Sequence, residues 1–226
     1  NNLVTVSAYR RNSELLTADS HSKKPRMCDL YALYQEKLKQ SGVMDFDDIL
    51  LNMNILLRDN PKAHAEIADR FSYIMVDEYQ DTNRAQYLIL KKLSQFHHNL
   101  CVVGDDSQSI YAFRGARIEN ILKFKQDYPE CKLFRLERNY RSTTTIVDAA
   151  NSLIAHNEGR IPKECYAVGD PGELIKILKS YTEQEEAVNI VYEIQARMRS
   201  DHAQYQDFAV LYRTNAQSRI FEESLR

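Results

Sequence analysis

Short apolar runs alternate with amphipathic helical segments over most of this chain, and no other feature of the sequence limits the fold as strongly. Strands are predicted at residues 73–76, 100–103, 132–136, 175–181 and 208–212. Helices are predicted at residues 28–40, 84–96, 118–127 and 183–198, and further helices should start near 45, 142 and 215. Strands that alternate with helices form parallel sheets, which the helices cover. The sequence therefore predicts an α/β fold.

The expected helix ends near the N-terminus carry capping residues. Gly42 should end the helix at 28–40, because glycine is the usual residue just past a helix C-terminus. Asp45 should cap the next helix, whose apolar residues recur at intervals of three and four, and Pro61 should break it. Both helices are therefore expected to be amphipathic and short.

Composition excludes several classes of protein. The 226 residues are enough for one or two domains, and 43% hydrophobic and 27% charged residues are typical of globular proteins. No apolar run approaches the roughly 20 residues of a membrane-spanning helix. The four cysteines form no C-x-x-C pair, which argues against a zinc site and predicts a reducing, cytoplasmic compartment. Because the net charge is -2, any nucleic-acid contact must come from a local patch or from aromatic residues.

Two carboxylates, Asp77 and Glu78, follow the expected strand at 73–76. They would lie at the carboxyl end of a buried strand, where open α/β sheets bind ligands. Asp77 suits Mg²⁺, which takes one or two protein carboxylates together with phosphate oxygens and water, and Glu78 could deprotonate an attacking water. Alternatively, the strand ends in acids because it reaches solvent. The polar residues 79–83 that follow are more than a turn requires, which favours a site.

A second polar segment, residues 104–109, follows the expected strand at 100–103. Loops after neighbouring parallel strands lie on one edge of the sheet, so Gln108 could face the same phosphate as Asp77. A neutral amide can bond a terminal phosphate or its attacking water and lose that bond on product release. The alternative is a loop glutamine without such a role.

Two aromatic residues and an arginine come next, at Tyr111, Phe113 and Arg114. On a loop, such residues stack on bases and contact phosphates without reading the sequence of the nucleic acid. Alternatively, the rings pack in the protein core. The sequence therefore leaves both a single-strand contact and a packing role open for these rings.

Tyr140 and Arg141 lie just before an expected helix that Ser142 or Thr143 would cap, and a helix N-terminus favours anions. Tyr140 could stack on a nucleobase, and Arg141 could act as an arginine finger on phosphates bound to a neighbouring domain. The alternative is a surface arginine beside a packing tyrosine. A later strand-to-helix turn at 212–219 suits phosphate contacts equally well.

Six segments occur in a fixed order: DFDD at 45–48, VDEYQDTN at 76–83, VGDDSQSIY at 103–111, FRGA at 113–116, NYRST at 139–143 and LYRTNAQSR at 211–219. Together they resemble the UvrD/PcrA/Rep family of superfamily 1 DNA helicases. The resemblance covers the chain from about residue 28 to its end. It implies RecA-like parallel sheets flanked by helices, as in the P-loop NTPase helicases. It also implies ATP-driven 3′ to 5′ movement on single-stranded DNA and duplex unwinding in repair or replication.

The resemblance also implies roles for individual residues, with ATP and Mg²⁺ as the bound groups. Asp77 would match the Walker B ligand of Mg²⁺, Glu78 the catalytic base and Gln108 the sensor of the γ-phosphate. Tyr140 would match the ring that stacks on adenine, and Arg141 the finger that contacts the γ-phosphate. The positions that touch or gate single-stranded DNA would be Tyr111, Phe113, Arg114, Arg213 and Asn215.

The sequence departs from the family pattern in three ways. Family members often carry an acidic residue where Ser107 stands and a tryptophan where Phe113 stands, although phenylalanine still stacks. The six glycines form no G-x-x-x-x-G-K spacing, so the Walker A loop is expected before Asn1 and the last family motifs after Arg226. We therefore expect an excerpt of a longer protein that is inactive by itself.

The resemblance divides the chain into three parts. Residues 1–40 would end a helical accessory subdomain, 41–136 would form the second half of the first RecA-like ATPase domain, and 137–226 would begin the second RecA-like domain. The expected partners are single-stranded DNA, its junctions with duplex, and repair or replication proteins, without a membrane. Two alternatives remain: the helicase subunit of a recombination helicase-nuclease, and a non-catalytic DNA-binding module that retains motor motifs.

Overall fold

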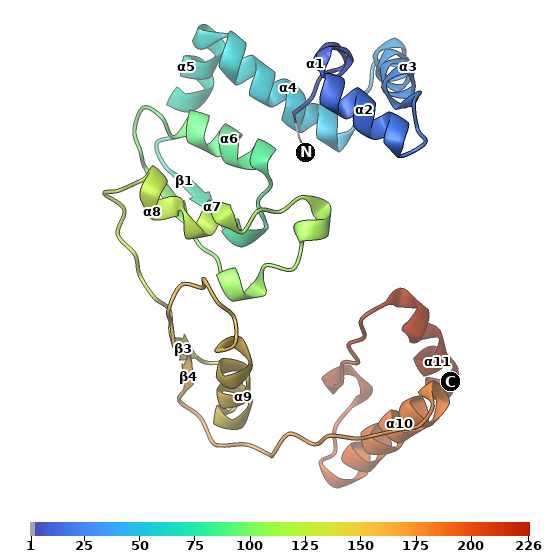
Figure 1. The fold of residues 1–226 in the computed structure, drawn as a ribbon. Coiled ribbons are helices and arrows are strands. Elements are labelled where there is room, and N and C mark those ends of the chain that lie inside the picture. Colours follow the sequence, from blue (N-terminus) through green and yellow to red (C-terminus); the bar gives the residue numbers. More distant parts are fainter. Residues whose placement is uncertain (1–2) are drawn as a thin grey trace. The chain divides into compact units, whose positions relative to one another are not determined.

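The computed structural model describes residues 3–226 (Figure 1). The chain divides into two compact units. The first unit runs to Glu137 and also contains Asn151–Glu164. The second unit consists of Arg138–Ala150 and Cys165–Arg226. In the described residues, no helix is both long and apolar enough to cross a membrane.

The first unit is mostly helical. Its helices are α1 Val6–Arg11, α2 Ser13–His21, α3 Met27–Gln40, α4 Phe46–Asp59, α5 Pro61–Asp69, α6 Arg84–Leu93, α7 Glu119–Leu122 and α8 Phe124–Asp127. Polar side chains cap the starts of five of them, at Thr5, Asn12, Asp45, Asn60 and Asn83; Asp45, for example, accepts a hydrogen bond from the Asp48 N–H at 2.7 Å. Because each cap accepts an N–H of the first turn that has no partner within the helix, the helix starts are fixed locally.

Two short strands in the first unit, β1 Ile74–Val76 and β2 Leu100–Val102, pair in parallel. In their register Ile74 lies opposite Leu100 and Val76 opposite Val102. The pairing continues past both strands, since the Val103 N–H donates to the Val76 carbonyl at 2.8 Å and the Tyr79 N–H donates to the Val103 carbonyl at 2.9 Å. The segments that follow β1 and β2 are therefore held side by side.

Helices α4, α5 and α6 pack against one another (Figure 1). Side chains bond across the contacts: Asn54 of α4 donates to the Ala85 carbonyl at 3.1 Å, and a ring nitrogen of His64 on α5 lies 2.7 Å from the Lys92 carbonyl. His64 and Ala85 are both buried. These polar contacts fix α5 and α6, which flank β1 in the sequence.

Tyr79 anchors the segment after β1 in the core. Its side chain is almost fully buried, and its ring meets the Phe124 ring edge-on with 5.6 Å between centroids. Phe124 in turn stacks on Tyr128 at 4.8 Å. Burial raises the pKa of the Tyr79 phenol, so this residue stays neutral and acts as a packing residue. The residues on either side of Tyr79 are consequently held in place against α8.

The second unit contains one short pair of strands and three helices. Strands β3 Arg138–Asn139 and β4 Tyr166–Ala167 pair in parallel. Helix α9, Thr144–Ile154, begins in this unit, and its last residues belong to the first. Helices α10 Glu183–Ser200 and α11 Asn215–Leu225 pack against each other. With these parallel strands and helices, the described chain is of the α/β class, as the sequence predicts.

Three of the five predicted strands are wrong. Residues 132–136, 175–181 and 208–212 form no strand, and the first segment instead leads into β3 at Arg138. An apolar run becomes a strand only where a neighbour supplies the ladder hydrogen bonds, and large apolar side chains such as Phe134 and Ile177 are exposed here. The helix expected at 118–127 is broken at Lys123 into α7 and α8. Helices α1, α2 and α5 were not expected.

Candidate active site

Asp77 and Glu78 follow β1 directly, and both side chains are exposed at the carboxyl end of the strand. Glu78 has a left-handed backbone, with φ of 50° and ψ of 40°, which few residues other than glycine adopt. One carboxylate oxygen of Asp77 accepts the Glu78 N–H at 2.9 Å. Such strain persists only where the surroundings enforce it, and it is common at functional sites.

Gln80 joins the segment after β1 to the segment after β2. Its Nε2 donates to Oε2 of Glu78 at 2.7 Å, and its Oε1 accepts the backbone N–H of Asp105 at 3.0 Å. The residue is only 1% exposed. A buried amide with both ends bonded has one orientation, because turning it would leave two polar groups unsatisfied. Glu78 is therefore held relative to the β2 loop.

Asp105 organises that loop. Its Oδ1 accepts the Ser107 N–H at 2.9 Å and its Oδ2 accepts Nε2 of Gln108 at 2.9 Å. Burial by itself would raise the pKa of Asp105, but the ion pair with Lys163 and the hydrogen bonds from Gln108 and Ser107 outweigh it and lower that pKa. Asp105 is thus ionised at neutral pH, and its charge holds the Gln108 amide.

Tyr111, Phe113 and Arg114 form an exposed group, which we call the aromatic loop. The two ring centroids are 6.0 Å apart, and the Arg114 guanidinium lies 5.3 Å from the Tyr111 ring and 5.5 Å from the Phe113 ring. Phe113 is 79% exposed. Phe113 therefore does not pack in the described core, and the packing alternative is wrong for this ring. An exposed ring beside an arginine suits base stacking with a phosphate contact.

Thr82 and Asn120 connect the aromatic loop to the β1 segment. Asn120 donates from Nδ2 to the Thr82 carbonyl at 3.0 Å and to its hydroxyl at 3.1 Å, and both residues are buried. The Thr82 hydroxyl donates to the Tyr79 carbonyl at 2.7 Å, and the Arg117 N–H donates to the Thr82 carbonyl at 3.0 Å. The chain on both sides of the aromatic loop is therefore bonded to the residues after Glu78.

Tyr140 and Arg141 lie in the second unit, and both side chains are exposed. The side chain of Asn139 accepts the N–H groups of Arg141 at 2.9 Å and Ser142 at 2.8 Å, which fixes this turn. The Arg138 guanidinium lies 4.9 Å from the Tyr140 ring. Thr143 precedes α9, but its buried hydroxyl makes no hydrogen bond within the described part of the chain. Asn139, outside the expected capping pair, holds the turn instead.

Arg213 and Asn215 lie at the start of α11, and both are exposed. Gln217 accepts the N–H groups of Arg213 at 3.0 Å and Thr214 at 2.9 Å, so it forms the return half of a capping box. The backbone of this turn is therefore fixed, while the two side chains remain on the surface.

The structure thus brings together Asp77, Glu78 and Gln108 in the first unit, through Gln80 and Asp105. Sequence reasoning gave no individual role to Gln80, Asp105 or Lys163. The dense polarity of 79–83 was the only signal for Gln80. No sequence signal marks Lys163, which lies 58 residues from Asp105.

The donor set at the end of β1 fits Mg²⁺. No cluster of three or more metal-ligating side chains occurs among the described residues, but Mg²⁺ bound with a nucleotide needs only one or two carboxylates, and phosphates and water supply the rest. Asp77 meets that requirement because it is exposed and one of its carboxylate oxygens makes no hydrogen bond to the described chain.

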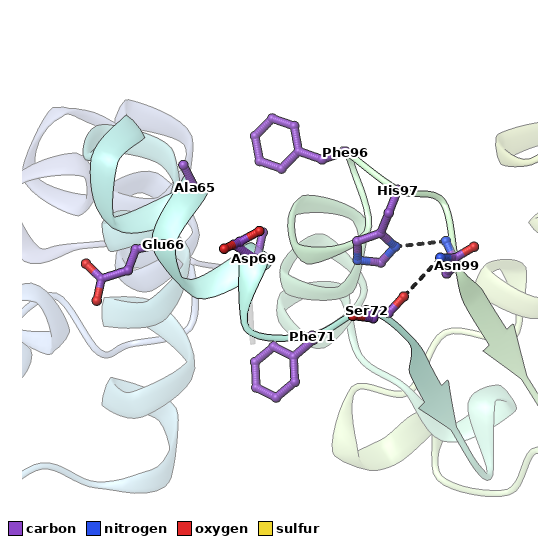
Figure 2. A pocket seen from close by; sticks show the side chains of 9 residues that line it. Ala65, Glu66, Asp69, Phe71, Ser72, Phe96, His97 and Asn99 are labelled. Carbon is purple, nitrogen blue, oxygen red and sulfur yellow. Dashed lines mark hydrogen bonds between the residues drawn. The ribbon is translucent and has the colours of Figure 1, made fainter.

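A separate hollow of about 700 Å³ lies at the other end of these strands (Figure 2). Phe71, Ser72 and Asn99 precede β1 and β2, and Asn99 donates to the Ser72 carbonyl at 3.0 Å and to a ring nitrogen of His97 at 2.9 Å. Because Asp77 and Glu78 follow the strand that Ser72 precedes, this hollow is distinct from the carboxylate site.

Comparison with known proteins matches nearly the whole chain to two family models. Residues 3–129 match the UvrD/REP helicase N-terminal domain, and residues 134–226 match the UvrD-like helicase C-terminal domain. An ATP-dependent DNA helicase PcrA of Leuconostoc citreum is 48% identical over 199 residues, covering 88% of this chain and 27% of the relative. PcrA of Staphylococcus epidermidis strain RP62A is 46% identical over 206 residues, covering 91% of this chain and 28% of the relative.

The chain therefore spans about a quarter of the length of these curated relatives. The two family models meet between residues 129 and 134, shortly before the division between the compact units after Glu137. At 46% to 48% identity over 88% to 91% of this chain, the chain and these relatives are expected to share a fold. On the strength of both models and these relatives, the chain belongs to the UvrD/REP helicase family.

Proposed function

We propose that this chain is the central part of an ATP-dependent DNA helicase that moves 3′ to 5′ along single-stranded DNA and unwinds duplex during repair or replication. Residues 1–40 would end a helical accessory subdomain, 41–136 would complete the first RecA-like domain, and 137–226 would begin the second. Family membership and the names of the relatives support this proposal.

The hydrogen bonds that join Glu78 to Gln80 and Gln80 to Asp105 are the main support for this proposal. They hold the residues after β1 and the residues after β2 in one bonded group, with lengths of 2.7 Å and 3.0 Å. An acidic group and a neutral amide that share one edge of a parallel sheet can act on the same phosphate. This arrangement supports nucleotide hydrolysis better than a simple binding role.

In this proposal each residue in the first unit has a defined task. Asp77 would hold Mg²⁺, which when bound with ATP neutralises phosphate charge. Glu78 accepts a proton from the attacking water, and because Gln80 bonds its Oε2, the other carboxylate oxygen, Oε1, is left for that water. Gln108 senses the terminal phosphate through its amide.

In the second unit, Tyr140 and Arg141 are the residues proposed to bind ATP. Tyr140 is an exposed ring that can stack on adenine, and Arg141 is an exposed guanidinium that can contact phosphate oxygens in pairs. Both follow Asn139, which fixes their backbone. An arginine offered in this way stabilises charge that develops during phosphoryl transfer.

Single-stranded DNA would contact the aromatic loop and the start of α11. Phe113 and Tyr111 would stack on bases, and Arg114, Arg213 and Asn215 would contact the backbone or gate the strand. The Thr82–Asn120 hydrogen bonds supply a physical route between the DNA contacts and the carboxylate site. Junctions with duplex and repair or replication proteins are the further partners we propose. No disulfide bond joins the four cysteines in the described part of the chain, which supports a reducing, cytoplasmic location.

The test uses the full-length gene product and the variant Glu78→Gln. Loss of a general base should lower ATP turnover by about 10² to 10⁴-fold, while binding of a fluorescent ATP analogue is kept. The control Glu66→Gln removes an exposed acid that pairs with Arg70 on α5 and should leave turnover unchanged. Turnover that survives Glu78→Gln would overturn the base assignment.

Strand polarity is tested with duplexes that carry either a 3′ or a 5′ single-stranded tail. We expect unwinding only of the 3′-tailed duplex, and unwinding of the 5′-tailed one would refute the proposed direction. A full-length product that binds single strands but neither binds nor hydrolyses ATP would instead be a DNA-binding module that retains motor motifs.

A further inference from the structure

A loop that lies outside the six helicase segments in the sequence contacts Asp105, whose carboxylate accepts a hydrogen bond from the proposed phosphate sensor, Gln108. We propose that Lys163 is a positioning residue, which holds the Gln108 amide in one orientation through the carboxylate of Asp105. Lys163 lies outside all six segments on which the family resemblance depends. The inference rests on the proposed function, because it assigns Gln108 a role in ATP hydrolysis.

The side-chain ammonium of Lys163 lies close to two adjacent carboxylates of the first unit. Its Nζ forms an ion pair with Oδ1 of Asp105, and Oδ1 of Asp106 lies 3.8 Å away. The Lys163 side chain is 20% exposed, and that of Asp106 only 4%. A partly buried ion pair is screened less by water and salt than a surface pair. This ion pair should therefore stabilise the loop more than most exposed ion pairs would.

The backbone of the same loop is also attached to this segment. The Ile161 N–H donates to Oδ2 of Asp106 at 2.9 Å, and the Arg160 guanidinium donates to the Lys163 carbonyl at 3.2 Å. Asp106 is therefore bonded to the loop backbone while its neighbour Asp105 is bonded to the loop side chain. The position of Lys163 is thus set by more than its own flexible side chain.

Asp105 links Lys163 to Gln108 through its two carboxylate oxygens. The ammonium of Lys163 and the Ser107 N–H occupy Oδ1, which leaves Oδ2 for the Gln108 amide at 2.9 Å. A carboxylate bonded from both sides has one rotamer, and the amide that bonds its second oxygen then has a fixed acceptor. Without Lys163, only the Ser107 N–H restrains Oδ1, so the Asp105 carboxylate is held less firmly and the Gln108 amide has a less fixed acceptor.

The expected consequence concerns the chemical step rather than nucleotide binding. An amide that samples several orientations spends less time where it can bond the terminal phosphate, which lowers kcat, whereas the main binding contacts lie elsewhere. We expect Lys163→Met to lower kcat by about tenfold and to change KM for ATP by less than about twofold. Lys163→Arg keeps the charge and should restore at least half of the wild-type kcat.

The experiment measures ATP turnover of the full-length gene product for both variants. The matched control is Lys91→Met, which removes another lysine–aspartate pair of the same unit, the 2.9 Å contact with Asp127, away from the site. Thermal unfolding of each variant checks the fold. A Lys163→Met variant with wild-type kcat, or one no more impaired than Lys91→Met, would overturn the proposal.

A double-mutant cycle with Gln108→Ala separates positioning from a general structural effect. If Lys163 acts through Gln108, then Lys163→Met should lower kcat by less than about twofold when Gln108 is already alanine. A full tenfold fall in that background would show that Lys163 acts elsewhere and would overturn the proposal. The proposed function fails separately, because it predicts loss of turnover in Glu78→Gln whatever residue occupies position 163.

Discussion

The Cβ atom that any other residue would carry at position 104 falls 2.5 Å from the side-chain oxygen of Gln80. The same Cβ would lie 3.0 Å from Cδ1 of Ile121 and 3.2 Å from the backbone nitrogen of Tyr79. Gln80 cannot move aside cheaply, because it is buried and bonded at both ends. Gly104 is thus the residue that lets the segment after β2 approach the segment after β1 closely.

Gly104→Ala should therefore displace Gln80 and break the link between Glu78 and Asp105. We expect a loss of about 1–3 kcal/mol in the free energy of unfolding, together with lower ATP turnover in the full-length protein. Gly169→Ala is the matched control, since its Cβ would meet nothing within 4 Å and should change stability by no more than about 0.5 kcal/mol. Urea unfolding measures both. Equal stabilities of the two variants would contradict the contact.

Phe113→Ala should weaken binding of single-stranded DNA by about 1–3 kcal/mol, the usual contribution of one aromatic–base stack. Phe113 and Phe134 are both 79% exposed, so Phe134→Ala is a control matched in residue type and exposure. Fluorescence anisotropy with labelled oligothymidine gives the affinities, and DNA-free ATP hydrolysis should change little in either variant. If both variants lose affinity equally, or if Phe113→Ala loses hydrolysis and affinity together, the stacking role is wrong.

Local signals at the helix ends predicted α3 and α4, but α1, α2 and α5 were missed although Thr5, Asn12 and Asn60 cap their starts. Asp45 does start α4, and Gly42 follows α3 with φ of 65°. A cap depends on atoms within four residues, so sequence spacing can indicate it. The strands expected at 132–136, 175–181 and 208–212 do not form, because a strand also needs a partner, and pairing is not visible in an apolar run.

Sequence reasoning likewise located only part of the candidate site. Asp77, Glu78 and Gln108 follow strands that pair in parallel, and the rule for loops at one sheet edge finds them. The sequence marks Gln80 only as part of a polar run, although its two hydrogen bonds form the bridge between Glu78 and Asp105. Lys163 could not be found, since its contact with Asp105 depends on how a loop 58 residues away folds back.

Acid should abolish the contribution of Asp105 to stability. Burial raises its pKa, but bonds from Lys163 and Gln108 lower it more, so the folded pKa lies below the usual value near 3.8. The stabilisation is then fully present above the unfolded pKa of about 4 and is lost as the pH falls through the folded pKa. At pH 6 the free energy of unfolding of the wild type should exceed that of Asp105→Asn by about 1 kcal/mol. This difference should disappear as the pH falls below 4.

Urea unfolding between pH 3 and pH 7 measures this difference. The exposed Asp170 provides a control, and Asp170→Asn should change the free energy of unfolding by no more than about 0.5 kcal/mol. A difference between wild type and Asp105→Asn that stays constant with pH, or that grows in acid, would contradict the ion pair with Lys163.

Arg141 offers the sharpest test of the second unit. Its side chain is exposed, and its N–H rather than its guanidinium bonds Asn139, so Arg141→Ala should leave thermal unfolding unchanged. In the full-length protein the same variant should lower ATP turnover by about 10³-fold or more, because an arginine finger acts only on developing phosphate charge.

Arg141→Lys should not restore turnover, since an ammonium cannot contact two phosphate oxygens in the planar forked geometry of a guanidinium. The exposed Arg135 is the control, and Arg135→Ala should hydrolyse ATP at the wild-type rate. Full activity of Arg141→Ala would make Arg141 a surface arginine beside an exposed tyrosine. Rescue by lysine would instead show that only positive charge matters, and the paired contact with phosphate would then be wrong.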